Sequence, residues 1–173
     1  MIHFLGDYTT IILATVAGLF ILFMRIQQFR SHIGALHKAK ERHDFVVYDK
    51  TLIRNIINIT LIFVSTFFIV YFTVFNFSDI NAGLAIIAVL SFVSELFSNQ
   101  IFRKVYYDDS AFFFVQDLVA YRSVATFKKR HSPFVMDVIL HDRQTVIVPS
   151  KFLLVIQEKM VANKERKKER KKK

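Results

Sequence analysis

The stretch that most constrains the fold is residues 56–77, "IINITLIFVSTFFIVYFTVFNF", which contains no charged side chain. A helix needs roughly 20 apolar residues to cross the hydrocarbon core of a bilayer, and this run meets that length without tilting. Two further apolar runs, at about residues 8–24 and 80–97, approach the same length. The sequence therefore predicts three transmembrane helices within a membrane region covering residues 1–100.

Composition supports a membrane protein and removes several kinds of site. Hydrophobic residues make up 53% of the 173 residues and phenylalanine alone occurs twenty times, while the chain outside the three runs is too short to bury them in a soluble shell. Cysteine is absent. This excludes disulfides, thiolate metal sites and cysteine nucleophiles. Nothing in the sequence calls for a cofactor.

Basic residues mark the predicted cytoplasmic side. The segment between the first two runs, residues 25–55, is rich in them, whereas the connection "SDINAG" between the second and third runs has none. The first seven residues also lack lysine and arginine, so we expect the first span to be retained and not cleaved as a signal peptide. The positive-inside rule then predicts a multi-pass protein of the cell membrane, a bacterial inner membrane, with its amino terminus outside and its carboxyl terminus cytoplasmic.

The cytosolic loop, residues 25–55, is expected to begin as an amphipathic extension of the first helix. Its apolar residues recur at intervals of three and four, which is the helical period; they are Ile26, Phe29, Ile33 and Leu36. Its polar face is predicted to hold His32, His37, Glu41, His43 and Asp44. Of these, His37 and Glu41 stand four apart and form a weak candidate metal pair, without a second paired set nearby.

Residues 101–160 show short alternating runs separated by turn signals, which is typical of antiparallel strands. "FRKVYY" and "AFFFVQ" flank the turn "DDS", and "FVMDVIL" and "TVIV" flank "HDRQ". We expect about five strands followed by a helix capped by Ser150, whose apolar stripe covers the sheet; the stripe is Phe152, Val155, Ile156 and Met160. The rings of Phe112, Phe113 and Phe114 should alternate across one strand. The fold class is thus a three-helix membrane region with a small α+β cytosolic domain.

The tail, residues 161–173, carries eight lysines and arginines, interrupted by two glutamates in a repeated "KERK" unit. Such a run is a solvated continuation of the helix, a contact to anionic lipids, or an unspecific contact to RNA. No specific nucleic-acid site is expected, because aromatic stacking platforms are missing. The candidates for lipid contact are Lys164, Arg166, Lys167, Lys168, Arg170, Lys171, Lys172 and Lys173.

Motifs of catalysis are missing from the sequence: no phosphate loop, nucleophile elbow or HExxH pair occurs. Glu95 is the one ionisable residue inside an apolar run, and it could face a polar path, reach the headgroups or pair with Arg103 or Lys104. Ser65 and Thr66 are further intramembrane polar candidates, and together with Asn58 and Thr73 they suit hydrogen bonding between helices.

Two functions remain. The favoured one is a non-enzymatic accessory protein whose cytosolic module docks lipid or a membrane-protein partner such as a transporter. The alternative is a small transporter or pore-forming subunit that uses Glu95 and the span hydroxyls after homo-oligomerisation.

The layout resembles a known family. Three spans with a short outer turn, the stretch "KVYYDDSAFFFVQDLVAYRSVATF", the hairpin "FVMDVILHDRQTVIV" and the closing helix are similar to the YobD-like family of small bacterial membrane proteins. The resemblance covers most of the chain up to Met160 and rests on layout, not on a diagnostic motif. It implies a cytosolic domain of pleckstrin-homology type and brings no catalytic residues, and the basic tail lies outside the family pattern.

Overall fold

The computed structural model describes residues 8–170, other than the side chains of Lys168 and Arg170. The chain forms two compact units, one of residues 1–31 and 50–101 and one of residues 32–49 and 102–173. We call them the helical unit and the β module.

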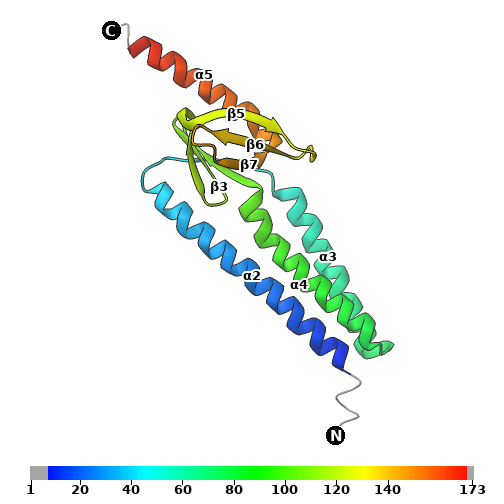
Figure 1. Cartoon of the computed structure of the whole chain (residues 1–173). Coiled ribbons are helices and arrows are strands. Elements are labelled where there is room, and N and C mark those ends of the chain that lie inside the picture. Colours follow the sequence, from blue (N-terminus) through cyan, green and yellow to red (C-terminus); the bar gives the residue numbers. More distant parts are fainter. Residues whose placement is uncertain (1–7, 171–173) are drawn as a thin grey trace. The chain divides into compact units, whose positions relative to one another are not determined.

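The helical unit contains most of three long helices, labelled in Figure 1: α2 (Thr9–Lys40), α3 (Leu52–Val70) with its π-helical extension η1 (Tyr71–Phe75), and α4 (Asp79–Phe102). The end of α2, from His32, belongs to the β module, as does Phe102 of α4. Within the described residues these helices are long and apolar enough to cross a membrane, as judged by length and composition. The 24 residues Leu52–Phe75 extend over roughly 36 Å at the helical rise. The prediction of three long apolar helices is confirmed.

Helix α4 contacts both α2 and α3 and lies between them (Figure 1). Toward α2, a Cβ placed on Gly18 would come within 2.4 Å of Leu90 Cδ1, so the absence of a side chain permits the close approach. At the start of α2, the Asp79 carboxylate accepts the backbone N–H groups of Thr10 and Ile11, both at 3.0 Å. A helix amino terminus has such free donors and favours a negative charge.

The β module contains two antiparallel sheets and a carboxyl-terminal helix. The first sheet has the order β1 (Val46–Asp49), β2 (Lys104–Tyr107), β3 (Ala111–Phe114), β4 (Asp117–Ala120), and the second has the order β5 (Val124–Lys129), β6 (Val135–Leu140), β7 (Thr145–Pro149). The 3₁₀ turn η2 (Tyr121–Ser123) connects the sheets, and η3 (Ser150–Phe152) leads into α5 (Leu153–Arg170).

Side chains from both sheets and from α5 share one core. Phe112 and Val119 of the first sheet, Val138 and Val148 of the second, and Ile156 of α5 are all buried in it. The stripe predicted on the closing helix is confirmed, since Phe152 and Ile156 are fully buried and Val155 and Met160 pack against them. Burial of a large apolar side chain contributes about 1.5–3 kcal/mol, so this core is the main stabilising element of the module.

The predicted alternation of the three phenylalanines on β3 is also confirmed. Phe112 and Phe114 belong to the core between the sheets. Phe113 points to the opposite face, where it packs against Leu36 and Ala39 in the last turns of α2. Both faces of β3 are therefore covered, and all four of its residues are buried.

The sequence predicts about five strands in residues 101–160; the structure has six there, and β1 adds a seventh to the module. The two additional strands are β1 and β4, each four residues long. β1 lies in the segment expected to be a loop between two spans. β4 follows β3 after a two-residue turn, Val115–Gln116, that lacks any glycine or proline signal. Val115 adopts φ 58°, a conformation that a β-branched residue rarely takes.

The amphipathic face predicted for the end of α2 is also corrected. Ile33 is 47% exposed, while His32, assigned to the polar face, is only 2% exposed. The His32 Nδ1 atom donates a hydrogen bond to the backbone carbonyl of Val115, and the ring packs against Phe113. A buried imidazole is stabilised when its polar atom finds such a partner. The buried stripe of this helix end is therefore His32, Leu36 and Ala39.

Ser150 does not cap the closing helix. Its hydroxyl donates to the Pro133 carbonyl at 2.7 Å, and the turn η3 begins after Pro149 without a side-chain cap. The bond instead ties the end of β7 to the loop before β6. Phe134 lies in this loop, ahead of the strand, and is 78% exposed.

Candidate functional site

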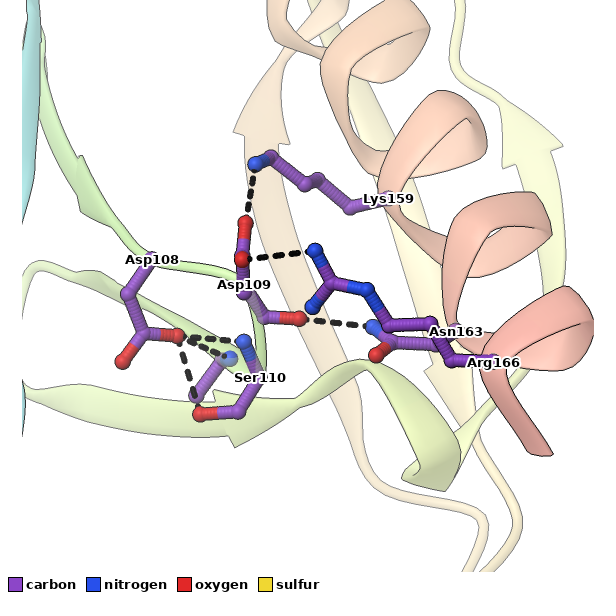
Figure 2. A network of polar contacts seen from close by, with 7 residues as sticks. Asp108, Asp109, Ser110, Lys159, Asn163 and Arg166 are labelled. Carbon is purple, nitrogen blue, oxygen red and sulfur yellow. Dashed lines mark hydrogen bonds and ion pairs between the residues drawn. The ribbon is translucent and has the colours of Figure 1, made fainter. Parts of the chain in front are cut away.

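The turn between β2 and β3 is organised by Asp108. Its Oδ1 atom accepts the backbone N–H of Ser110 at 2.5 Å and of Ala111 at 2.7 Å, and the Ser110 hydroxyl at 2.9 Å. Its Oδ2 atom lies 2.6 Å from His43 Nδ1. Figure 2 shows Asp108 beside Ser110 in this network. The sequence "YYDDSA" forms this turn because an aspartate readily hydrogen-bonds the backbone two residues further on.

The combination of aspartate, histidine and serine does not have the geometry of a catalytic triad. The Ser110 hydroxyl approaches His43 at the same nitrogen, Nδ1, that contacts Asp108, at 3.4 Å. In a triad the carboxylate and the nucleophile use opposite ring nitrogens, so that the histidine can accept the proton from the serine. Here the serine hydroxyl donates directly to the carboxylate. The cluster therefore acts as a structural turn.

Asp109, the next residue, attaches helix α5 to the same turn (Figure 2). Its two carboxylate oxygens accept from Lys159 at 2.5 Å and from Arg166 at 3.0 Å, and its backbone carbonyl accepts from the Asn163 side chain at 2.7 Å. The three donors are spaced by four and three residues and thus lie on one face of the helix. This face fixes the rotation of α5 over the sheets.

The local environment shifts the pKa of several groups in the module. Burial opposes ionisation of Asp108, but the hydrogen bonds from Ser110, Ala111 and His43 outweigh it and hold the carboxyl pKa below its usual value. The hydrogen bonds and charges of Lys159 and Arg166 lower the pKa of Asp109. Burial raises the pKa of the Tyr121 phenol well above its usual value. Both aspartates are therefore ionised, and Tyr121 is neutral, at neutral pH.

Beside this turn the module contains an open groove of about 740 Å³. It is bounded by the end of β4, the turn η2, the start of β5, the β6–β7 turn and helix α5. Its lining includes three basic side chains, Arg122, Lys164 and Lys167, and two imidazoles, His43 and His141. No aspartate or glutamate belongs to the lining. The groove is the candidate binding site of the module.

The basic tail residues are distributed over two faces of one helix. α5 continues through Arg170, which confirms that the helix extends into the "KERK" repeat. Arg166 is paired with Asp109, whereas Lys164 and Lys167 line the groove. The side chains of Lys168 and Arg170, and Lys171, Lys172 and Lys173, lie outside the described residues.

The polar residues predicted to act within the helices lie at separate positions. Glu95 is half-buried on α4 and makes no salt bridge among the described residues, while Lys104 pairs with Asp49 at 3.0 Å. The Thr66 and Thr73 hydroxyls donate to carbonyls of their own helix, at Ile62 and Ile69, and so do not bridge helices as expected. Ser65 is half-buried on α3.

The polar bridge between helices comes from other residues. The Asn99 amide of α4 donates to Asn55 of α3 at 3.1 Å. Asn58, one turn further along α3, is buried, and its Nδ2 atom has no hydrogen-bond partner in the described structure.

His37 and Glu41 are both exposed at the end of α2, which finishes at Lys40. In the part of the chain that the structure describes, no three histidine, aspartate or glutamate side chains gather in a way that could hold a metal ion. The weak candidate pair therefore gains no third ligand there.

In comparisons with known proteins, the chain has no significant match to a family model, a curated protein or a solved structure.

Sequence reasoning missed the groove because its lining comes from five separate segments. One signal was present: Lys159, Asn163 and Arg166 follow the helical period directly after the apolar stripe. This spacing indicates a second docked face on the same helix. Its acceptor, Asp109, stood in a turn that the sequence analysis treated only as a polar connection.

Proposed function

We propose that this chain is an integral membrane protein with three spans that presents its β module on the cytoplasmic side, where the module docks lipid or a membrane-protein partner such as a transporter. In this proposal the protein is an accessory or scaffold component without catalysis of its own. One observation carries the proposal: β1 and β2 pair along four residues, from Val46↔Tyr107 to Asp49↔Lys104, although α3 and α4 lie between them in the chain.

This topology couples the module to the helices. The chain passes between the two units three times, after residues 31, 49 and 101. Only two residues separate β1 from α3, and one separates α4 from β2. A module on a single flexible linker samples a wide volume. A module with three short connections to the helical unit suits docking at the membrane.

The surface of the helices supports membrane insertion. Phe63 is 72% exposed, Phe67 is 66% exposed and Phe75 is 76% exposed. Large exposed apolar surfaces are unfavourable in water, at about 25 cal/mol per Å², and mark contact with lipid or protein. A bilayer would cover these rings without an additional protein partner.

The orientation proposal follows from the cations. The connection between η1 and α4, residues 76–78, has no basic residue, whereas residues 25–55 hold seven. Because the chain has no cysteine, a single one can be introduced without background. A membrane-impermeant maleimide should label Phe77→Cys in intact cells and Ser132→Cys only after permeabilisation. Labelling of Ser132→Cys in intact cells would refute the orientation.

The docking proposal can be tested on the surface of the module. Phe134 is an exposed aromatic ring on a loop of the module. We expect Phe134→Ser to reduce the partner recovered by cross-linking and purification in mild detergent, while Lys128→Ser, at an exposed position on β5, leaves recovery unchanged. Equal recovery with the chain truncated after Ile101 would refute docking through the module.

The pleckstrin-homology type of the module, and with it the YobD-like family, remains part of the proposal. Two antiparallel sheets of four and three strands, followed by a carboxyl-terminal helix, support the fold type. A solution structure of the full chain with a different strand order would contradict it.

A second candidate is a small transporter or pore-forming subunit. One face of α4 bears the buried polar residues Ser94, Ser98 and Asn99 beside half-buried Glu95. Polar groups at membrane depth commonly line solute paths. In reconstituted vesicles, Glu95→Gln should abolish solute or ion flux if this candidate is correct, and it should leave partner capture unchanged if the docking function is correct.

A further inference from the structure

The charges of the groove are unbalanced in a way that distinguishes it from the neighbouring surface. On one face of α5, Lys159 and Arg166 share one counter-ion, Asp109. On the adjacent face, Lys164 and Lys167 line the groove, and neither forms an ion pair within the described structure. Arg122, in the turn η2, also lines the groove and has no ion-pair partner in the described structure. Three cations therefore share a concave surface without a counter-ion from this part of the chain.

Helix α5 is held so that these lysines keep their direction. Asp109 binds residues 159, 163 and 166, and the residues that follow them by one position, Met160, Lys164 and Lys167, line the groove. The spacing of four and three residues is the same for both sets, so one docked face orients the other. The lysines are presented by an anchored helix and not by a free tail.

One neighbouring carboxylate offsets only part of this charge. Asp108 contacts two lining residues, His43 and Ser110, and accepts hydrogen bonds from Ser110 and Ala111 in the turn. In the described structure it forms no ion pair with the three cations. The groove is therefore still cationic and favours an external anion.

The groove also has an apolar wall. Tyr121 belongs to its lining but is almost fully buried, and its hydroxyl is enclosed by protein atoms. Leu118, Val124 and Met160 form the apolar part of the lining.

We propose that the groove binds a phosphate monoester, with its phosphate between Arg122, Lys164 and Lys167 and its organic part against Leu118, Val124 and Met160. An arginine guanidinium and two lysines match the charge and the oxygen acceptors of a phosphate. The source of the ester is either a lipid headgroup of the phosphatidic acid type or a soluble phosphate ester, which share this chemistry. This inference extends the proposed function and does not depend on which protein the module docks.

The test uses the full chain in zwitterionic nanodiscs and measures binding by calorimetry. The probes are dihexanoyl phosphatidic acid, glycerol 3-phosphate and, as a reference without a phosphate monoester, dihexanoyl phosphatidylcholine. We expect Arg122→Gln, and the pair Lys164→Gln with Lys167→Gln, each to weaken binding of the phosphate monoester by about tenfold or more. The control pair Lys128→Gln with Lys129→Gln removes the same charge from exposed positions on β5 and should change affinity by less than about twofold.

The outcomes separate the possibilities. Binding of phosphatidic acid alone supports the proposal and identifies a lipid source, whereas binding of glycerol 3-phosphate as well supports it with a soluble source. The proposal is overturned if neither monoester binds, if phosphatidylcholine binds as tightly, or if the control pair loses as much affinity as the groove pair. Cysteine labelling at residues 77 and 132 reads out the membrane topology separately, so failure here leaves that proposal intact.

Discussion

The ring of Phe152 offers a quantitative test of the inserted topology, because it joins the segment between α2 and α3 to the rest of the module. The side chain is fully buried, and its ring centroid lies 5.5 Å from that of Tyr107, 5.6 Å from Tyr48 and 5.9 Å from Phe112. Tyr48 belongs to β1 and the other two rings to β2 and β3. Phe152 therefore packs against β1, which precedes α3 and α4 in the chain, and against β2 and β3, which follow them.

The magnitude follows from these contacts. Truncation of a buried phenylalanine to alanine costs about 3–5 kcal/mol, which is a large share of the stability of a small domain. The milder change Phe152→Leu keeps most of the apolar volume and loses the three ring pairs, so we expect a loss of about 1.5–3 kcal/mol. Of this, the pair with Tyr48 should account for about 0.5–1.5 kcal/mol as a coupling energy.

Hydrogen exchange of the full chain in detergent, read by mass spectrometry on peptides from β2 and β3, measures this loss. A loss of that size corresponds to exchange about 10- to 100-fold faster. The double mutant of Tyr48→Leu and Phe152→Leu should be less destabilised than the sum of the single mutants. As a control, Phe134→Leu makes the same change at a ring that is 78% exposed, and it should stay within about 0.5 kcal/mol. Strict additivity of Tyr48 and Phe152 would show that β1 does not pack in the module, and the inserted topology would be wrong.

Three further predictions follow from single contacts. Asp108 has a lowered pKa in the folded state, so its contribution to stability is present above its ordinary pKa and is lost as the pH falls through the folded value. In Asp108→Asn the free energy of unfolding should therefore fall less steeply with decreasing pH; an unchanged slope would argue against the turn network. Asp109→Asn should speed hydrogen exchange in α5 beyond residue 159 and leave β6 and β7 unchanged; equal acceleration in β6 would show that Asp109 does not act through the helix. Gly18→Val should lower the melting temperature because the new side chain meets Leu90. Gly34→Ala, with open space around it, should raise stability by up to about 1 kcal/mol through helix propensity. A higher melting temperature for Gly18→Val than for Gly34→Ala would refute the α2–α4 packing.

Local patterns predicted much of the architecture. Runs of apolar residues define the three helices, since the length and hydrophobicity of a helix depend on consecutive residues. Alternation and turn residues likewise predicted the hairpins β2–β3 and β6–β7 and the buried stripe of α5. The strand β4 was missed because no glycine or proline signal separates it from β3. The strand β1 was missed because its partner, β2, is distant in the chain.

The candidate site was less accessible to such reasoning. The predicted tail residues Lys164 and Lys167 do line it, but Arg122 and His141 had no signal of their own. His32 was placed on the wrong face because sequence reasoning assigns a histidine to the polar side of a helix. In the structure it is buried by packing against Phe113, and its Nδ1 atom bonds to the Val115 carbonyl.

The sequence by itself determined the three long apolar helices and the small antiparallel module, because these features depend on residues close to one another in the chain. Only the tertiary structure decided that β1 and β2 meet across the helices between them, that Asp109 anchors α5, and that three cations surround one groove. Those juxtapositions join residues far apart in the chain. They result from pairing and packing of whole elements, which no local pattern encodes.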